Sequence, residues 1–281
     1  MKQLPLIIIA CLCCAIAVHY EMNKRYDLTG TSFAQLMYLP TGKYVKYTAC
    51  GYDNLLADGI YLWSIQYYSD PTFRPHMEYL RHIYELITEL DPAFVDAYQT
   101  GALFMFYDGR DPKSGFALLD KGFQNNPSQW IIPTNAGFYA MMAMKDNKLA
   151  DHYFEQASKV PEAPSLVVQM LAGLRFRQGE RSEAYQLWKR VYENADTPAI
   201  KQIAIQHVHE LKVLIDLDNL RKAVKLFSDH FGKYHLHLDQ LVSVRLLAEI
   251  SLDPEDQSYE YNAQTGDVKY SGNLIVYKNY E

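Results

Sequence analysis

One spacing pattern recurs along the middle of the sequence and constrains the fold more than any other feature. A small or apolar residue is followed four positions later by a large apolar one, and three positions after that by another small or apolar one. The pattern occurs at Leu80, Tyr84 and Ile87, at Gly115, Leu119 and Gly122, at Ala150, Phe154 and Ala157, and at Ala184, Trp188 and Val191. Successive copies begin 34 or 35 residues apart. Steps of four and three residues put the three side chains on one face of a helix, so each copy predicts a helix.

Proline follows the first three copies closely, at Pro92, Pro127 and Pro161. Because proline lacks an amide hydrogen and restrains the residue before it, each of these helices is predicted to end just ahead of it. A weaker copy of the pattern, Ala223 and Phe227, lies 39 residues after Ala184 and Trp188.

A second set of helices is indicated by glycines at intervals of 36 residues, Gly101, Gly137 and Gly173, each among apolar residues. Glycine inside a helix costs up to about 1 kcal/mol relative to alanine, so its use there favours a close approach of two helices. Each repeat is therefore predicted to be a hairpin of two helices. One hairpin cannot bury its own apolar face, and stacking on its neighbours does so.

The period and the small–large–small pattern resemble the tetratricopeptide repeat, most clearly in "GLRFRQGERSEAYQLWKRVYENADTP" at 173–198. The resemblance covers residues 52–231 and implies a mainly α fold, a right-handed α-solenoid of about five hairpins with the last one degenerate. A generic array of helical hairpins is the alternative. In tetratricopeptide arrays the first helices line a groove that binds peptides or helices. Recurring aromatic residues are the candidates for that groove: Trp63, Tyr67, Phe104, Tyr107, Trp130 and Tyr139.

The segments on either side of the repeats are expected to close the ends of the array. Residues 21–51 are expected to form a linker and an N-terminal cap, with a short extended stretch at 36–50 because Tyr and Val alternate there with Lys and Thr. Residues 232–281 are expected to form a C-terminal cap. It begins with an amphipathic helix at 239–250, and a β-hairpin follows because "SYEY" and "DVKY" flank "NAQTG". This end partly resembles the ends of type II secretion pseudopilins.

The first 20 residues carry an uncharged apolar run from Leu4 to Val18. As a helix this run is about 22 Å long, marginal for a bilayer and suitable for the apolar part of a signal peptide. A retained signal anchor through residues 4–20, a cleaved signal peptide, a lipoprotein signal ending at Cys11 and a buried core helix remain open. The first three place the body outside the cytoplasm of a bacterium, and single-pass anchoring in the inner membrane with a periplasmic body is preferred.

Composition and motifs limit the kinds of partner, metal site and catalytic site that we expect in this chain. The net charge of −6 comes without a basic block, which argues against a nucleic-acid partner. Outside the N-terminal run the chain has one cysteine, Cys50, so a disulfide framework or a cysteine-rich zinc site is excluded. The histidines in "HVHEL" at 207–211 and "HFGKYHLHLD" at 230–239, and the carboxylates in "DPEDQ" at 253–257, lack the spacing of known metal sites. We therefore expect no metal, cofactor, small-molecule substrate or catalytic site.

These observations favour a non-catalytic, membrane-anchored scaffold that binds another protein of the bacterial cell envelope through its repeats. An accessory component of a type II secretion or type IV pilus-like assembly is the alternative, because of the resemblance at the C-terminal end. A metal-dependent hydrolase using the histidines between 207 and 239 is a more distant alternative.

Overall fold

The computed structural model describes residue 17, residues 42–69, 77–232 and 234, and residues 237–254 and 258–280. The apolar run at 4–18 therefore lies outside the described residues apart from Ala17, as does the whole of the segment at 21–41. The chain divides into two compact units, residues 1–126 and 127–281. In the parts that the structure describes, no helix combines the length and the apolar character needed to cross a membrane.

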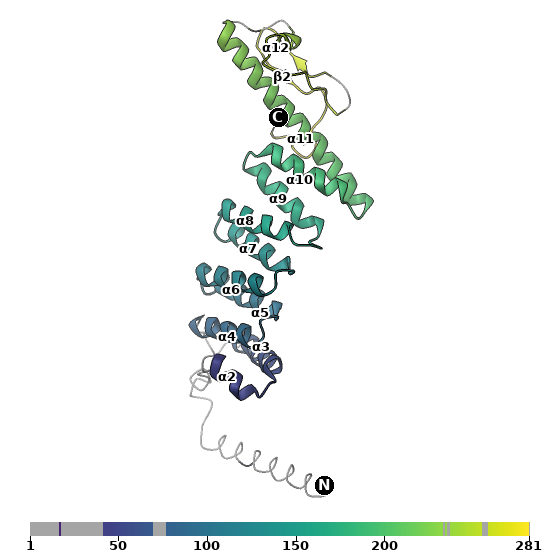
Figure 1. Ribbon diagram of the computed structural model, residues 1–281. Helices are drawn as coiled ribbons and strands as arrows, with labels where there is room; N and C mark the ends of the chain where they lie inside the picture. Colours follow the sequence, from purple (N-terminus) through teal and green to yellow (C-terminus); the bar gives the residue numbers. More distant parts are fainter. Residues whose placement is uncertain are drawn as a thin grey trace. The chain divides into compact units, whose positions relative to one another are not determined.

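The first unit is a succession of antiparallel helices in which each packs on the next. Its described elements are α2 (Gly42–Ala49), α3 (Asp53–Ser69), α4 (Met77–Leu90), α5 (Val95–Tyr107) and α6 (Pro112–Asn125). Helices α3 and α4 form one hairpin, and α5 and α6 form the next (Figure 1).

The second unit continues the alternation and then departs from it. It contains α7 (Ile131–Met142), α8 (Asn147–Ser158), α9 (Ser165–Arg177), α10 (Arg181–Glu193), α11 (Pro198–Phe231), α12 (Asp239–Ser243), β1 (Glu260–Tyr261) and β2 (Val268–Lys269). Each helix from α7 to α11 packs on the next, and α11 is the long green helix beside the C-terminal segment in Figure 1. The described residues are thus mainly helical, with one small antiparallel sheet.

The repeated pattern identifies the core of the second helix in each hairpin. Tyr84 and Phe154 are fully buried, and Trp188 is 5% exposed. Their small partners let neighbouring helices approach: a Cβ on Gly115 would lie 2.7 Å from the ring of Phe106, and Ala150 and its equivalents are fully buried. The helices also end ahead of the prolines, at Leu90, Asn125 and Ser158. The prediction of recurring helical hairpins is confirmed for these four pairs of helices.

The three glycines of the first helices differ in how closely other side chains approach them. A Cβ on Gly101 would lie 2.7 Å from Tyr84, and one on Gly137 would lie 2.7 Å from Phe154, so both glycines permit the close approach that was predicted. A Cβ on Gly173 would meet no atom within 4 Å. The prediction of a close helix contact at Gly173 is therefore wrong.

Three elements of the structure differ from the sequence-based expectations. The last and degenerate of the five hairpins expected within 52–231 is instead the single helix α11, because the stretch between its halves has no glycine or proline and its leucines continue the helical spacing. The extended stretch at 36–50 is helical over 42–49, where Val45 and Ala49 are buried and α2 packs on α4. The helix expected at 239–250 ends at Ser243, and Arg245 has a positive φ of 60°.

The expected β-hairpin is present. Tyr261 pairs with Val268 and Glu260 with Lys269, in an antiparallel register around Asn262 and Gly266. The hairpin and the residues beside it pack on α11, where the buried Tyr259, Val268, Leu274 and Tyr277 belong to the same apolar cluster as the leucines of that helix. The C-terminal segment thus covers apolar residues of α11.

Candidate protein-binding surfaces

The aromatic residues proposed for the groove fall into two groups, one in each unit. In the first unit Tyr67 is 6% exposed and stacks on Trp63, with ring centroids 5.3 Å apart. Phe104 is 8% exposed, and its ring lies 3.9 Å from that of Tyr68. The stack of Tyr68 on Phe104 links α3 to α5, whereas Tyr67 and Phe104 belong to the buried core of this unit and the partly buried Trp63 packs against it.

Tyr107 is the candidate that presents the most surface. Its side chain lies on α5 and is 60% exposed, and Leu103, one turn earlier on the same helix, is 42% exposed. Nearby, the Tyr68 hydroxyl donates a hydrogen bond to Asp108 over 2.6 Å, and this bond, followed by burial and by the charge of the carboxylate, raises the pKa of Tyr68. The last turn of α5 therefore carries adjacent apolar and acidic groups at the surface.

In the second unit Trp130 and Tyr139 are both half-buried. Trp130 precedes α7, and its carbonyl accepts a hydrogen bond of 2.8 Å from Thr134 Oγ1, a residue of the first turn. Phe138 and Met142 on the same helix are 38% and 65% exposed, although neither was among the candidates. The periodicity identified helices that carry exposed apolar side chains without identifying which of their residues are exposed.

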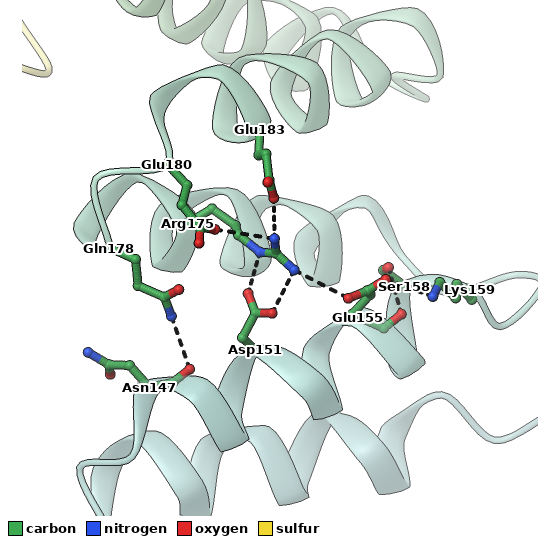
Figure 2. Close-up of polar contacts among 9 residues, drawn as sticks. All are labelled: Asn147, Asp151, Glu155, Ser158, Lys159, Arg175, Gln178, Glu180 and Glu183. Atoms are coloured by element: carbon green, nitrogen blue, oxygen red, sulfur yellow. Dashed lines mark hydrogen bonds and ion pairs between the residues drawn. The ribbon is translucent and has the colours of Figure 1, made fainter.

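A charged cluster joins α8, α9 and α10 in the second unit (Figure 2). Arg175 of α9 forms ion pairs with four carboxylates, which belong to Asp151, Glu155, Glu180 and Glu183. The contact with Asp151 is bidentate, through Nε and Nη2. Bidentate pairing of arginine with a carboxylate is among the strongest polar contacts in proteins.

The central ion pair of this cluster is largely buried, which strengthens the attraction between its charges. The side chain of Arg175 is 17% exposed and that of Asp151 is 16% exposed. Burial by itself would lower the pKa of Arg175, but the hydrogen bond and the charge of Asp151, with those of Glu183 and Glu180, raise it. The guanidinium stays charged, and its four partners leave the cluster with a net negative charge.

A surface depression of about 420 Å³ lies beside this cluster, between α8, α9 and α10. Leu171 and Leu187 are its apolar lining, and the charged groups around it include Glu183, Lys159 and Arg190. An apolar floor with charges of both signs at its edge suits the side chains of a protein partner. No local motif indicates Arg175 in the sequence, because its acidic partners come from α8, from α10 and from Glu180 just before α10.

A second polar arrangement binds the C-terminal segment to α11. The buried carboxylate of Glu210 accepts hydrogen bonds from the backbone N–H groups of Ile275, Val276 and Tyr277, over 3.1, 2.8 and 2.9 Å. Gln206 donates to the same carboxylate over 3.2 Å. The only local signal for Glu210 is weak, a glutamate in the apolar stretch of α11, because its partners lie about 65 residues further along the chain.

His207 lies beside this arrangement. Its ring stacks on Trp188 with centroids 3.7 Å apart and an interplanar angle of 4°. Its Nδ1 lies 2.7 Å from the hydroxyl of Tyr277. Burial lowers the pKa of His207, and the charge of Glu210 opposes that shift. The histidine is thus part of the packing between α10, α11 and the C-terminal segment.

The other histidines and carboxylates considered as metal ligands are dispersed. His209, His230 and His237 are exposed, whereas His235 and residues 255–257 lie outside the described residues. In the part of the chain that the structure describes, no three His, Cys, Asp or Glu side chains gather where they could hold a metal ion. Cys50 is exposed and is the free cysteine of the described residues.

The sequence matches no described protein family, and no curated protein shows a significant similarity to it.

Proposed function

We propose that this chain is a non-catalytic scaffold of the bacterial cell envelope, which binds another protein through the exposed side chains of its helical repeats. The observation that carries the proposal is the succession of paired helices, two pairs in each unit, in which each helix packs on the next. Such arrays present extended surfaces and serve widely in protein recognition. We infer that the array is an α-solenoid of the tetratricopeptide type.

The surface chemistry supports a protein partner. Leu103 and Tyr107 in the first unit are exposed side chains on a first helix of a hairpin, next to the carboxylate of Asp108. Tyrosine is enriched at protein interfaces because its ring packs while its hydroxyl stays hydrogen-bonded. The depression near Arg175 offers a similar mixture of apolar and charged groups in the second unit.

The compartment is part of the same proposal. We propose that the apolar run at 4–18 tethers the chain to the inner membrane and that the repeats lie in the periplasm. This rests on the composition of that run, which lies outside the described residues apart from Ala17.

The test is site-specific photocrosslinking in the source cells. A photoreactive residue replaces Tyr107 in one strain and Tyr47, which is 75% exposed on α2, in a control strain. We expect a discrete crosslinked species from position 107 and none from position 47. The captured protein is then purified and titrated against the full chain.

In that titration, Leu103→Ala/Tyr107→Ala is expected to weaken binding at least tenfold, whereas Tyr47→Ala leaves it unchanged. Interface residues of this kind typically contribute 1 kcal/mol or more when they are central, which is about fivefold each. Absence of a crosslink at position 107, together with absence of one at Met142 of α7 and Leu187 of α10, would contradict the proposal.

A further inference from the structure

The last described residues, 273–280, form a segment in which some side chains are buried and the others are exposed. Leu274 and Tyr277 are buried, with 4% and 6% of their surface exposed. Ile275 and Val276 between them are 70% and 40% exposed. Two anchors three residues apart, separated by exposed residues, are what a short peptide presents when it lies on a protein surface.

The backbone of this segment is held by a side chain and not by a strand. Three consecutive N–H groups, those of residues 275, 276 and 277, all donate to the carboxylate of Glu210. Among the residues that the structure describes, no strand pairs with this segment, in contrast to β1 and β2 earlier in the chain. A carboxylate that accepts backbone N–H groups recognises the main chain of a peptide whatever its side chains are.

The side-chain anchor Tyr277 is buried among side chains of the helices, and these surrounding side chains are called its crevice below. Its ring lies 4.2 Å from that of Phe176 on α9, and its hydroxyl is hydrogen-bonded to Nδ1 of His207 on α11. His207 is itself fixed by stacking on Trp188 of α10. The crevice therefore combines an apolar wall with one polar group placed for a phenol, which distinguishes tyrosine from phenylalanine.

The end of the segment is held at the edge of the same crevice. The ring of Tyr280 lies 4.8 Å from that of Phe176, and Arg181 donates to the carbonyl oxygen of Tyr280 over 3.3 Å. Arg181 is held in turn by Asp218 of α11, over 2.6 Å. The contacts that fix the segment thus come from side chains of α9, α10 and α11.

We propose that this crevice, formed by Phe176, Arg181, Trp188, His207 and Glu210, is a peptide-binding site that the chain's own residues 273–280 occupy. The external ligand is a peptide of the same chemistry: an aliphatic residue, two residues of any kind with free backbone N–H groups, and a tyrosine. The segment acts as an internal competitor for that ligand. This inference rests on the proposed function, because it gives the scaffold a second site with a defined class of partner.

The test uses a fluorescent synthetic peptide with the sequence of residues 271–280, SGNLIVYKNY, titrated against the full chain by fluorescence anisotropy. The unaltered chain is expected to bind the peptide weakly, because its own segment competes. Tyr277→Ala in the chain releases the internal competitor and leaves the crevice intact, so the peptide is expected to bind at least tenfold more tightly. Adding Glu210→Gln to that variant removes the charge that holds the three N–H groups, and the gain is expected to disappear.

Matched controls separate the site from general effects of substitution. Tyr52→Ala removes a tyrosine that is 70% exposed, and Glu193→Gln neutralises an exposed glutamate on α10. Neither control is expected to change the affinity for the peptide. A peptide with phenylalanine in place of the tyrosine that corresponds to Tyr277 is expected to bind several-fold more weakly, because it lacks the bond to His207.

Hydrogen exchange on the unaltered chain tests the same idea without any variant. The amides of residues 275–277 are expected to exchange at least tenfold faster than those of Leu211, Leu214 and Leu217 in α11, because the segment opens without the helix. Equal exchange in the two regions would overturn the proposal, since the segment would then unfold only with the core. Dimerisation of the chain by exchange of its C-terminal segments would overturn it in favour of a second copy as the occupant.

The outcomes for this site and for the proposed function are separable. A chain that crosslinks to its partner from position 107 but binds no peptide in any variant keeps the scaffold function and loses the crevice. A chain that binds the peptide but gives no crosslink keeps the crevice and loses the surface on α5.

Discussion

Replacing Arg175 with methionine is the most demanding test of how the second unit is held together. Methionine keeps much of the apolar length of the side chain but removes the guanidinium, which leaves four carboxylates without their shared partner. Asp151 is the most affected, because its side chain is only 16% exposed and it accepts two hydrogen bonds from Arg175. The carboxylates would also repel one another.

The expected size follows from burial. Removing one partner of a fully buried ion pair costs about 3–5 kcal/mol, and exposed pairs contribute about 1 kcal/mol or less. Arg175 and Asp151 lie near the buried limit, whereas Glu183 is 57% exposed and retains much of its hydration. We expect Arg175→Met to reduce the free energy of unfolding by about 2–3 kcal/mol. For a unit of this size, that lowers the melting temperature by roughly 5–10 °C.

The assay is thermal unfolding of the full chain followed by circular dichroism, with Lys189→Met as the matched control. Lys189 pairs with Glu193 over 3.8 Å, and both side chains are more than half exposed, so its loss is expected to cost less than about 0.5 kcal/mol. Adding Asp151→Leu to Arg175→Met removes the stranded buried charge and is expected to restore part of the stability. If Arg175→Met behaves like Lys189→Met, or if Asp151→Leu only adds to the loss, the cluster does not stabilise the unit as argued.

Two further predictions concern particular positions. Gly137→Ala puts a Cβ 2.7 Å from the ring of Phe154 and is expected to destabilise the chain by about 1–3 kcal/mol. Gly173→Ala puts a Cβ in open space and is expected to stabilise the chain by up to about 1 kcal/mol. Both changes are measured by thermal melting. Burial lowers the pKa of His207, so the unfolded chain binds a proton more readily than the folded chain as the pH falls below about 6.5. Stability is therefore expected to fall as the pH is lowered from about 6.5 toward the folded pKa, and His207→Gln is expected to flatten that dependence while His209→Gln, at an exposed position, does not.

The helical hairpins could be predicted from sequence because their signal is local and repeated. A small, a large and a small residue at steps of four and three identified the buried face of α4, α6, α8 and α10. The same pattern at Ala223 and Phe227 suggested a fifth hairpin, and both residues are buried, but on one continuous helix. The missing signal was a turn, because residues 212–219, "KVLIDLDN", contain no glycine or proline.

The candidate sites were harder to predict, because they depend on residues brought together by packing. Arg175 has partners from 5 to 24 positions away in sequence, and Glu210 binds backbone N–H groups whose position depends on the fold of the C-terminal segment. Backbone N–H groups carry no sequence signature at all. The aromatic residues of α3 and α5 were correctly placed on packed helices, yet burial of Tyr67 and exposure of Tyr107 depend on which neighbour each side chain faces.

The C-terminal segment has two parts, one fixed to α11 by several contacts and one whose backbone is held by the carboxylate of Glu210. Truncation is expected to separate the contributions of the two parts to stability. The fixed part has the β1–β2 pairs, the Tyr259 hydroxyl bonded to buried Asp216 over 2.9 Å, and Arg221 bonded to the carbonyl of Val268 over 3.0 Å. The second part, after Tyr270, depends on Glu210 and on the anchors Leu274 and Tyr277.

A chain that ends at Tyr270 therefore loses two buried side chains, whereas one that ends at Ser251 also loses Tyr259 and Val268 and leaves Asp216 paired with Lys212 but without the hydroxyl of Tyr259. Each buried apolar side chain contributes about 1.5–3 kcal/mol, so the longer truncation is expected to lower the melting temperature at least twice as much as the shorter one. The melting temperatures of both truncated chains and of the full chain are measured by circular dichroism. Equal losses would mean that the whole C-terminal segment is held as one block by residues 271–280, and the division into a fixed cap and a detachable segment would then be wrong.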